Sequence, residues 1–236
     1  MENNQQITLI VVDDHPLFRQ GVVEALSLEA GFNVIGQASN GEEALEMIQQ
    51  LLPDVAVVDI NLPGLNGNQV AHRVRQAKLA TRVVLLTAYD NPEQIIHAAW
   101  AGAYGYCPKQ IEPDCLALTI RKVLRGNYMI NGQEFTPQEF DEWLDQQMEQ
   151  ARHLYSEPGS PFHPLSDREM EVLGCVVKGM SNKEIAFSLK ISHQTVKNHV
   201  TSILRKFCVE DRTQAVVYAL KRGWVQLEEY DTKSEE

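Results

Sequence analysis

The chain has 236 residues, of which 44% are hydrophobic and 22% are charged, and its formal net charge is −11. These proportions are those of ordinary globular domains, so they exclude a chain that is largely disordered, collagen-like or coiled-coil. The longest apolar runs are too short to cross a membrane, and residues 1–6 lack the basic region that opens a secretory signal. We therefore expect a protein that stays in the cytoplasm and has no membrane partner.

Residues 1–126 alternate short apolar runs with helical patterns of apolar residues. The apolar runs predict strands at 7–12, about 33–37, 55–58, 82–87 and 103–107. The helical patterns predict helices at about 16–29, 41–51, 67–77, 91–101 and 112–125. Continuous apolar strands that alternate with helices are typical of a parallel sheet covered on both faces. Five such strands predict an α/β flavodoxin-like fold with a five-stranded parallel sheet in the order 2-1-3-4-5.

Polar side chains stand at the carboxyl ends of these predicted strands, where ligands bind in sheets of this kind. Asp13 and Asp14 follow the first strand, and Asp59 ends the third. Thr87 ends the fourth strand, and Lys109 follows the fifth. An Asp pair alone is often only a solvated turn or a helix cap, but the whole set on one edge is much more specific. Because three carboxylates repel one another and oxygen ligands suit Mg²⁺, the set predicts a magnesium site.

Four stretches of residues 7–126 resemble the receiver domain of two-component response regulators. They are Val-Val-Asp-Asp-His-Pro (11–16), Val-Asp-Ile-Asn-Leu-Pro-Gly-Leu-Asn-Gly (58–67), Leu-Leu-Thr-Ala (85–88) and Gly-Tyr-Cys-Pro-Lys (105–109). The resemblance implies that Asp59 accepts a phosphoryl group from a sensor histidine kinase. It also implies that Asp14 binds Mg²⁺ directly with Asp59, that Asp13 acts chiefly through water, and that the Asn61 backbone carbonyl supplies a further ligand.

The same resemblance assigns the remaining residues of the set. Thr87 and Lys109 would hold the phosphoryl oxygens, and Thr87 and Tyr106 would form the switch that responds to them. A carboxylate can attack phosphorus only if the negative charges are neutralised, which Mg²⁺ and Lys109 would do. One departure is that Lys109 is followed by Gln110, where many receivers have a proline; here Pro108 precedes the lysine.

Two other functions are compatible with a sheet of this type. An aspartyl-phosphate phosphohydrolase would carry a second aspartate two residues beyond its nucleophile, but that position holds Asn61. A receiver that never takes phosphate would use the fold only for docking, and the complete acidic set with Thr87 and Lys109 argues against it. We therefore expect no enzyme activity apart from self-phosphorylation and dephosphorylation at Asp59.

Residues 127–164 form an acidic linker, with one basic and seven acidic side chains. The run Thr-Pro-Gln-Glu (136–139) is typical of a helix start, and Phe140, Trp143 and Leu144 continue at helical spacing. This predicts a helix at about 136–152. It could pack on the receiver, form a dimer or partner surface, or cover the basic block that follows in the unphosphorylated state.

Residues 165–225 are the one basic block, with 10 basic and 6 acidic side chains, and an acidic tail follows at 226–236. Two capping boxes, at 166–169 and 181–184, and a third cap at Ser192 open successive helices, and a fourth helix is expected at about 212–222. The outer face of the third helix shows Gln194, Lys197, Asn198, Thr201 and Arg205. Such a face after a tight turn suits the DNA major groove, although periodicity alone leaves open a small bundle with a solvated face.

The amino-acid sequence of this block closely resembles that of the LuxR-type helix-turn-helix domain. It reads Leu-Ser-x-Arg-Glu (165–169), Gly-Met-Ser-Asn-Lys-Glu-Ile-Ala (179–186), Ile-Ser-x-x-Thr-Val-Lys-x-His-Val (191–200) and Ile-x-x-Lys (203–206). The resemblance implies base and phosphate contacts from Lys197, Asn198 and Thr201, and dimerisation through the last helix. The candidates for contacts to the DNA backbone are Lys183, Thr195, Arg205, Lys206 and Arg212. His199 is either structural or a DNA contact.

A receiver followed by a LuxR-type domain describes the NarL/FixJ class of response regulators. The resemblance therefore implies a DNA-binding transcriptional regulator that is activated by Mg²⁺-dependent phosphorylation of Asp59. It would bind paired half-sites on double-stranded DNA as a homodimer.

Overall fold

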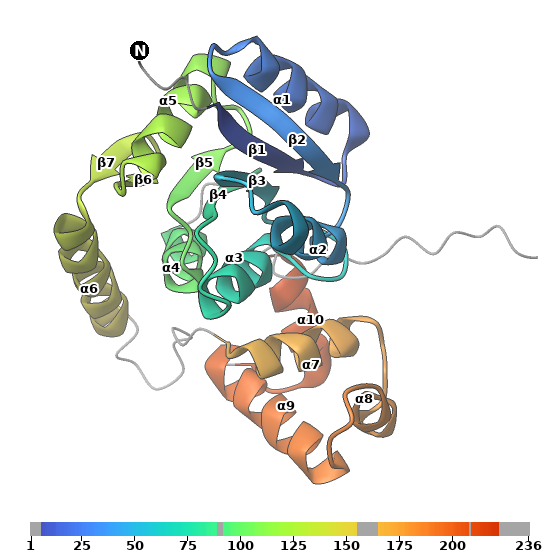
Figure 1. Cartoon of the computed structure of the whole chain (residues 1–236). Helices are drawn as coiled ribbons and strands as arrows, with labels where there is room; N and C mark the ends of the chain where they lie inside the picture. The colour runs from blue at the N-terminus through green and yellow to red at the C-terminus, as the bar shows by residue number, and fades with distance from the viewer. Residues whose placement is uncertain (1–5, 89–91, 155–164, 208, 222–236) are drawn as a thin grey trace, which may run out of the picture. The chain divides into compact units, whose positions relative to one another are not determined.

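The computed structural model describes residues 6–88, 92–154, 165–207 and 209–221 (Figure 1). The chain divides into two compact units, residues 1–149 and 150–236, which we call the N-terminal and the C-terminal unit. Within the described ranges, no helix is both long enough and apolar enough to cross a membrane.

The N-terminal unit alternates strands and helices up to α5 and then adds two strands and a helix. The strands are β1 (Ile7–Val12), β2 (Phe32–Ala38), β3 (Val55–Asp59), β4 (Arg82–Thr87), β5 (Gly105–Pro108), β6 (Tyr128–Ile130) and β7 (Gln133–Phe135). The helices are α1 (Pro16–Leu28), α2 (Gly41–Leu51), α3 (Gly67–Gln76), α4 (Pro92–Ala101), α5 (Pro113–Leu124) and α6 (Pro137–Leu154). Every strand and helix predicted for residues 1–126 is present.

The sheet has the order β2-β1-β3-β4-β5-β6-β7. Neighbouring strands are parallel except for β6 and β7, which are antiparallel. The predicted order 2-1-3-4-5 is confirmed. The prediction of five strands is matched only roughly, because residues 128–135 extend the sheet to seven strands. Asn131 and Gly132 have φ of 46° and 81°, the left-handed conformation required by the two-residue turn of a β-hairpin. The segment that follows residue 126 therefore begins as part of the sheet.

Alternate residues of the parallel strands face opposite sides of the sheet and build two separate cores. Leu9 and Val11 belong to the core that also contains apolar residues of α1 and α5. Ile10 and Val12 belong to the core shared with α2, α3 and α4. Helices therefore cover both faces of the sheet (Figure 1), which is why its strands are apolar without polar alternation.

Helix α6 packs on the core that contains α2, α3 and α4. At its start, the backbone N–H of Thr136 donates to Glu139 Oε2 at 2.8 Å. Phe140 is buried in the core, and its ring stacks on that of Tyr128 with 3.8 Å between the ring centroids. Of the three roles considered for the predicted helix, the structure shows packing on the N-terminal unit; the other two stay predictions.

The C-terminal unit contains α7 (Asp167–Val177), α8 (Asn182–Ser188), α9 (His193–Phe207) and α10 (Arg212–Lys221). Capping boxes open the first two helices, as the sequence predicted: Ser166 with Glu169, and Ser181 with Glu184. Side chains from all four helices share one apolar core, which includes Leu173, Ile185, Ile203 and Ala219. The apolar face of α9 packs in this core, and the opposite face of α9 is exposed to solvent.

Candidate functional site

Four side chains predicted at strand ends meet at the carboxyl edge of the sheet. Lys109 Nζ lies 2.7 Å from Asp59 Oδ2 and 2.8 Å from Asp13 Oδ2. Ligand atoms from Asp13, Asp14, His15 and Asp59 all lie within 4.8 Å of one another. Asp13 and Asp59 are buried, whereas Asp14 is partly exposed. We call Asp13, Asp14 and Asp59 the acidic cluster.

The backbone around Asp59 leaves no room for a side chain at Gly67. A Cβ atom on Gly67 would lie 2.3 Å from the carbonyl oxygen of Asp59, so only glycine fits where α3 begins. The backbone N–H of Gly67 donates to the carbonyl of Ile60 at 3.0 Å. On the other side, the N–H of Lys109 donates to the carbonyl of Thr87 at 2.7 Å. These close approaches hold the ends of β3, β4 and β5 together around the acidic cluster.

Burial and ion pairing shift the pKa values of Asp59 and Lys109 in opposite directions. Burial raises the pKa of Asp59 above its usual value, and the hydrogen bond and charge of Lys109 offset only part of that increase. Burial lowers the pKa of Lys109, but the hydrogen bonds and negative charges of Asp13 and Asp59 together raise it by more. Lys109 is therefore a persistent cation, and the negative charge on Asp59 is costly without a further counter-ion.

The oxygen atoms of this edge fit a hard divalent cation. The acidic cluster supplies carboxylate oxygens, which are the ligands that Mg²⁺ prefers. Asn61, expected to contribute its backbone carbonyl, lies beside them, and its N–H donates to Asp59 Oδ1 at 3.2 Å. The Asn61 side-chain oxygen is buried and accepts no hydrogen bond from any described residue. The donor set is therefore compatible with the predicted magnesium site.

The two residues expected to form the switch lie on adjacent strands. The Thr87 hydroxyl is buried and donates to Gln94 Oε1 of α4 at 3.2 Å. Tyr106 pairs with Leu85 across β4 and β5, and its side chain is fully buried in the core shared with α4. Thr87 thus lies at the site, and Tyr106 lies inside the fold.

Sequence reasoning missed three residues that contact the site. His15 Nδ1 lies 2.7 Å from Asp14 Oδ1, and the Phe18 ring lies 4.9 Å from Lys109 Nζ. His15 stands in the Asp-Asp-His-Pro stretch, so a signal for it was present. Gln94 had none, because its burial arises only when α4 packs on the sheet.

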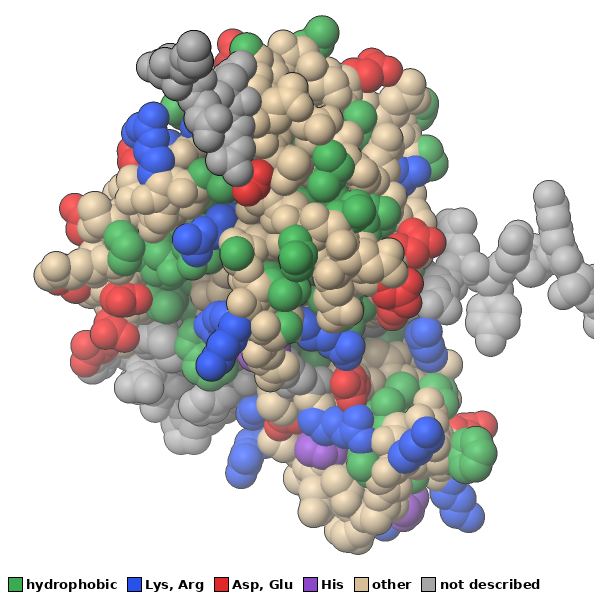
Figure 2. Space-filling model, viewed as in Figure 1, with side chains coloured by type: hydrophobic (Ala, Val, Ile, Leu, Met, Phe, Trp, Pro, Cys, Tyr) green, Lys and Arg blue, Asp and Glu red, His purple; other side chains and the backbone are tan. Residues whose placement is uncertain are grey.

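In the C-terminal unit, the polar face predicted on α9 is exposed. Gln194, Lys197, Asn198, Thr201 and Arg205 are all exposed and recur at helical spacing, while the opposite face of α9 belongs to the core. The Gln194 side-chain amide donates to Asn198 Oδ1 at 3.1 Å. Lys and Arg side chains are visible on this unit in Figure 2. Lys183, on α8, is also exposed.

Three of the residues expected to contact the DNA backbone make contacts inside the unit. Lys206 Nζ lies 2.6 Å from Glu169 Oε2, so it braces α9 against α7. The Arg212 guanidinium donates to the Met180 carbonyl and, at 3.3 Å, to Asn182 Oδ1. Lys206 and Arg212 therefore connect helices of this unit, and their expected contacts to the DNA backbone stay predictions.

The third of these residues is Thr195, whose hydroxyl lies 2.7 Å from the Ser192 hydroxyl at the start of α9. Thr195 is only partly exposed, as is His199. Thr195 therefore helps to cap the helix that carries the exposed face. Both roles considered for His199 stay open.

The ion pair of Lys206 with Glu169 predicts a pH dependence for the C-terminal unit. Burial raises the pKa of Glu169, but hydrogen bonds from Lys206, Ser202 and Ser166 outweigh it and lower the pKa from 4.5 to about 2. A carboxylate with a lowered pKa stabilises the fold above its unfolded-state value and loses that contribution as the pH falls through its folded-state value. We expect the stability of this unit to fall between about pH 4.5 and pH 2.

Urea unfolding at several pH values, followed by hydrogen exchange of α7 and α9, measures this effect. Glu169→Gln should lower the stability at pH 7 by about 1–2 kcal/mol, because the capping interaction weakens and Lys206 loses its partner. It should also flatten the dependence below pH 4.5. A variant with the parent's acid dependence would show that another group is responsible.

Comparisons with known proteins find a matching protein family for each of the two units. The family model for the response regulator receiver domain matches residues 9–121, and that for the luxR family of bacterial regulatory proteins matches residues 163–219. Transcriptional regulatory protein DegU of Brevibacillus brevis is 35% identical over 95% of this chain and 98% of its own length. Nitrate/nitrite response regulator protein NarL of Escherichia coli K12 is 32% identical over 92% of this chain and 97% of its own length.

Solved structures show the same folds. The signal receiver domain of a protein named NarL from Mycobacterium tuberculosis is 43% identical, with a TM-score of 0.51, and covers 52% of this chain and 98% of its own. RcsB from Salmonella enterica serovar Typhimurium, bound to a promoter, has a TM-score of 0.62 over 90% of this chain and 98% of its own. At 21% identity, that likeness concerns the fold alone.

These findings place the molecule among DNA-binding transcriptional regulators. The chain belongs to the NarL/FixJ class of response regulators, in which a receiver domain precedes a LuxR-type DNA-binding domain.

Proposed function

We propose that this response regulator is switched by Mg²⁺-dependent phosphorylation of Asp59, with a sensor histidine kinase as the phosphoryl donor. The observation that carries the proposal is the convergence of Asp59 with Lys109 and the other carboxylates at the carboxyl edge of the sheet. The receiver would comprise residues 1–126, and the DNA-binding domain residues 165–225. Residues 127–164 would connect them, although their first strands complete the sheet. The protein would work in the cytoplasm.

Each residue of the site has a defined part in the phosphoryl transfer. An Asp59 oxygen attacks the phosphorus of a phosphohistidine, the P–N bond breaks, and the electron pair returns to the imidazole. Asp14, Asp59 and the Asn61 carbonyl would hold Mg²⁺, with Asp13 acting chiefly through water, and the ion would supply charge neutralisation. Lys109 already contacts Asp59, and its cation offsets the charge that the phosphoryl group adds.

Thr87 and Tyr106 would change conformation in response to phosphorylation. A phosphoryl oxygen is a stronger acceptor than the Gln94 amide oxygen, so the Thr87 hydroxyl would turn from Gln94 toward the phosphoaspartate. That turn moves the end of β4 relative to α4 and changes the space around Tyr106. The outcome is a two-state receiver biased by one covalent charge.

Transfer of a phosphoryl group to Asp59 is tested by intact-protein mass measurement. The chain incubated with acetyl phosphate and Mg²⁺ should gain the mass of one phosphoryl group. Asp59→Asn should gain none, because an amide is not a nucleophile at phosphorus. Asp114→Asn, which alters an exposed aspartate in the first turn of α5, is the matched control and should behave as the parent does. Phosphorylation of Asp59→Asn at the parent's rate would disprove the assignment of the acceptor.

For DNA, we propose that the exposed face of α9 enters the major groove of each of two half-sites bound by a homodimer. Lys197, Asn198 and Thr201 would contact bases and phosphates. Lys183, Arg205 and Lys206 would contact the DNA backbone. Thr195 would support this face as a cap and could reach a phosphate from the end of α9. The support for this proposal is the coincidence of an exposed polar face with a helix fixed by the core.

Lys197→Ala is expected to weaken binding to double-stranded DNA and to flatten its salt dependence. A lysine that contacts a phosphate releases a counter-ion, so its loss should reduce the slope of log K against log salt by about 1. Titrations of labelled DNA at several salt concentrations measure this slope. Lys197→Arg keeps the charge and should keep the slope. Unchanged affinity and slope in Lys197→Ala would place the DNA on another face.

A further inference from the structure

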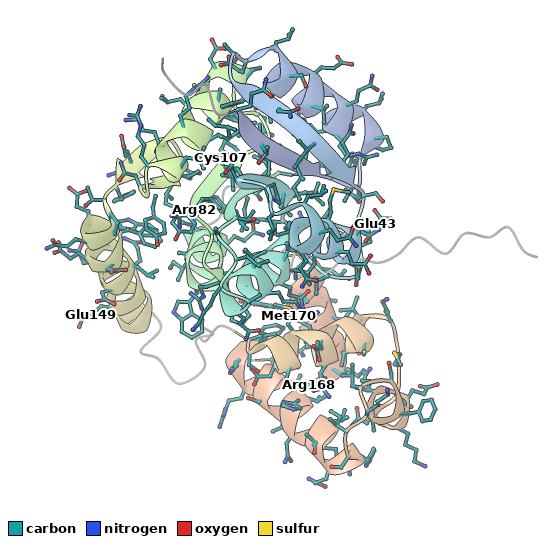
Figure 3. The ribbon with its side chains drawn as sticks, viewed as in Figure 1. Glu43, Arg82, Cys107, Glu149, Arg168 and Met170 are labelled. Atoms are coloured by element: carbon teal, nitrogen blue, oxygen red, sulfur yellow. The ribbon has the colours of Figure 1, made fainter. Side chains whose placement is uncertain are left out.

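The N-terminal unit contains a cavity of about 420 Å³ at the edge of the sheet opposite the acidic cluster. It is lined by residues of α3, α4 and α6 and by the beginnings of β4 and β6. Arg82, labelled in Figure 3, begins β4 at this cavity, whereas Thr87 ends the same strand at the phosphorylation site. The volume falls within the range of about 300–1,000 Å³ that is typical of small-molecule sites.

Basic side chains dominate the charge of the cavity. Arg75, Lys78 and Arg82 line it, together with one acidic side chain among the described residues, that of Asp141 on α6. In the part of the chain that the structure describes, none of the three basic residues forms an ion pair with a carboxylate. Three cations that line one cavity with a single described carboxylate repel one another, so an anion with two negative charges would relieve an unfavourable arrangement.

The Arg75 side chain is held in position beside the cavity. It lies across Gly102, where a Cβ atom would come within 2.6 Å of Arg75 Cδ. Gly102 has a φ of +94°, a conformation that favours glycine, and it ends the turn after α4. The stem of the Arg75 side chain therefore packs against the backbone at Gly102 and lines the cavity.

Aromatic rings form another part of the wall. The Arg82 guanidinium lies 4.1 Å from the centroid of the Tyr104 ring, which stacks on Tyr128 at 4.8 Å. Tyr128 stacks in turn on Phe140 of α6. Trp100 also lines the cavity and is 48% exposed, which is unusual for so large an aromatic side chain. An exposed tryptophan that lines a cavity with basic side chains is a surface on which a planar aromatic group can stack.

We propose that this cavity binds a purine nucleoside monophosphate, with the phosphate held by Arg75 and Lys78 and the base stacked on Trp100. The phosphate dianion matches the two net positive charges of the lining, and arginine binds phosphate oxygens through paired hydrogen bonds. The site is separate from Asp59, so binding does not depend on phosphorylation. The ligand also contacts α6, through Asp141 and Leu144, and therefore joins the α3–α4 surface to the helix that leads out of the unit.

Isothermal titration of the full-length protein with AMP, adenosine and inorganic phosphate tests the proposal. AMP should bind with a stoichiometry of one, and adenosine and phosphate should each bind at least about tenfold more weakly, since each lacks one of the two recognised groups. The double variant Arg75→Ala, Lys78→Ala should weaken AMP binding by about tenfold or more. Arg125→Ala, which alters an exposed arginine outside the cavity, should leave it unchanged.

Three outcomes would overturn the proposal. They are the absence of saturable AMP binding at millimolar concentration, AMP affinity that is equal in the double variant and the parent, and adenosine or phosphate binding as tight as that of AMP. Both substituted residues are exposed, so the double variant should fold, and its circular dichroism spectrum verifies this. Trp100→Leu provides a second variant with the charges intact and should weaken AMP binding but leave inorganic phosphate binding unchanged.

Discussion

Lys109→Ala should reduce the rate of Asp59 phosphorylation by acetyl phosphate by about 100-fold or more. In enzymes, loss of a single preorganised donor to the transition state costs about 10²–10³ in rate. Here the same amine is also the counter-ion of Asp13 and Asp59, at 2.8 Å and 2.7 Å. Its removal therefore leaves two buried carboxylates facing each other while a third negative group approaches.

The rate is measured by quenching the reaction at successive times and determining the phosphorylated fraction by mass. Lys122→Ala is the matched control, because Lys122 also forms an ion pair, with Glu134, but on the surface of α5 and β7. It should react at the parent's rate. If Lys109→Ala also reacts within twofold of the parent, Lys109 is not part of the phosphoryl site.

Phe140→Ala should destabilise the N-terminal unit by about 3–5 kcal/mol, the usual cost of removing a buried phenylalanine side chain. Phe140 is 3% exposed and lies between the rings of Tyr128 and Trp143, so its loss opens a cavity under α6. We expect α6 to lose its protection against hydrogen exchange before the parallel strands do, because Phe140 is the most buried of the α6 side chains whose burial the structure describes.

Urea unfolding of the full chain, followed by hydrogen exchange of β1 to β5, measures this change. Phe187→Ala removes the same side chain from α8, where it is 89% exposed, and should change stability by no more than about 0.5 kcal/mol. A loss below about 1 kcal/mol in Phe140→Ala would show that α6 does not rely on this contact.

Most of the fold of residues 1–126 could be predicted because burial on both faces leaves long apolar strands in the sequence. The hairpin β6–β7 was missed, since each strand has three residues and only one buried side chain of β7, Phe135, anchors it. A local signal existed: Asn131-Gly132, which follows the apolar run 128–130, is the usual turn of such a hairpin. Because residues 127–164 are acidic as a whole, the segment was interpreted as a linker with one helix, and the two short strands before α6 were not predicted.

The acidic cluster and Lys109 could be predicted because parallel topology brings strand ends to one edge. Gln94 could not, because nothing in the sequence shows which side of α4 faces Thr87. The ion pair of Lys206 could not be predicted for a related reason. Its position was judged from the spacing along α9 alone, whereas Glu169 reaches it from α7, 37 residues earlier in the chain.

The central claim is that phosphorylation of Asp59 controls DNA binding, and selection of genomic DNA fragments tests it most directly. Purified full-length protein is mixed with sheared genomic DNA, with and without Mg²⁺ and beryllofluoride, which mimics a phosphoryl group on Asp59. We predict enrichment of paired half-sites only when both are present, and none in Asp59→Asn. Equal enrichment of the same fragments in both states would keep the DNA-binding function but contradict the phosphorylation switch.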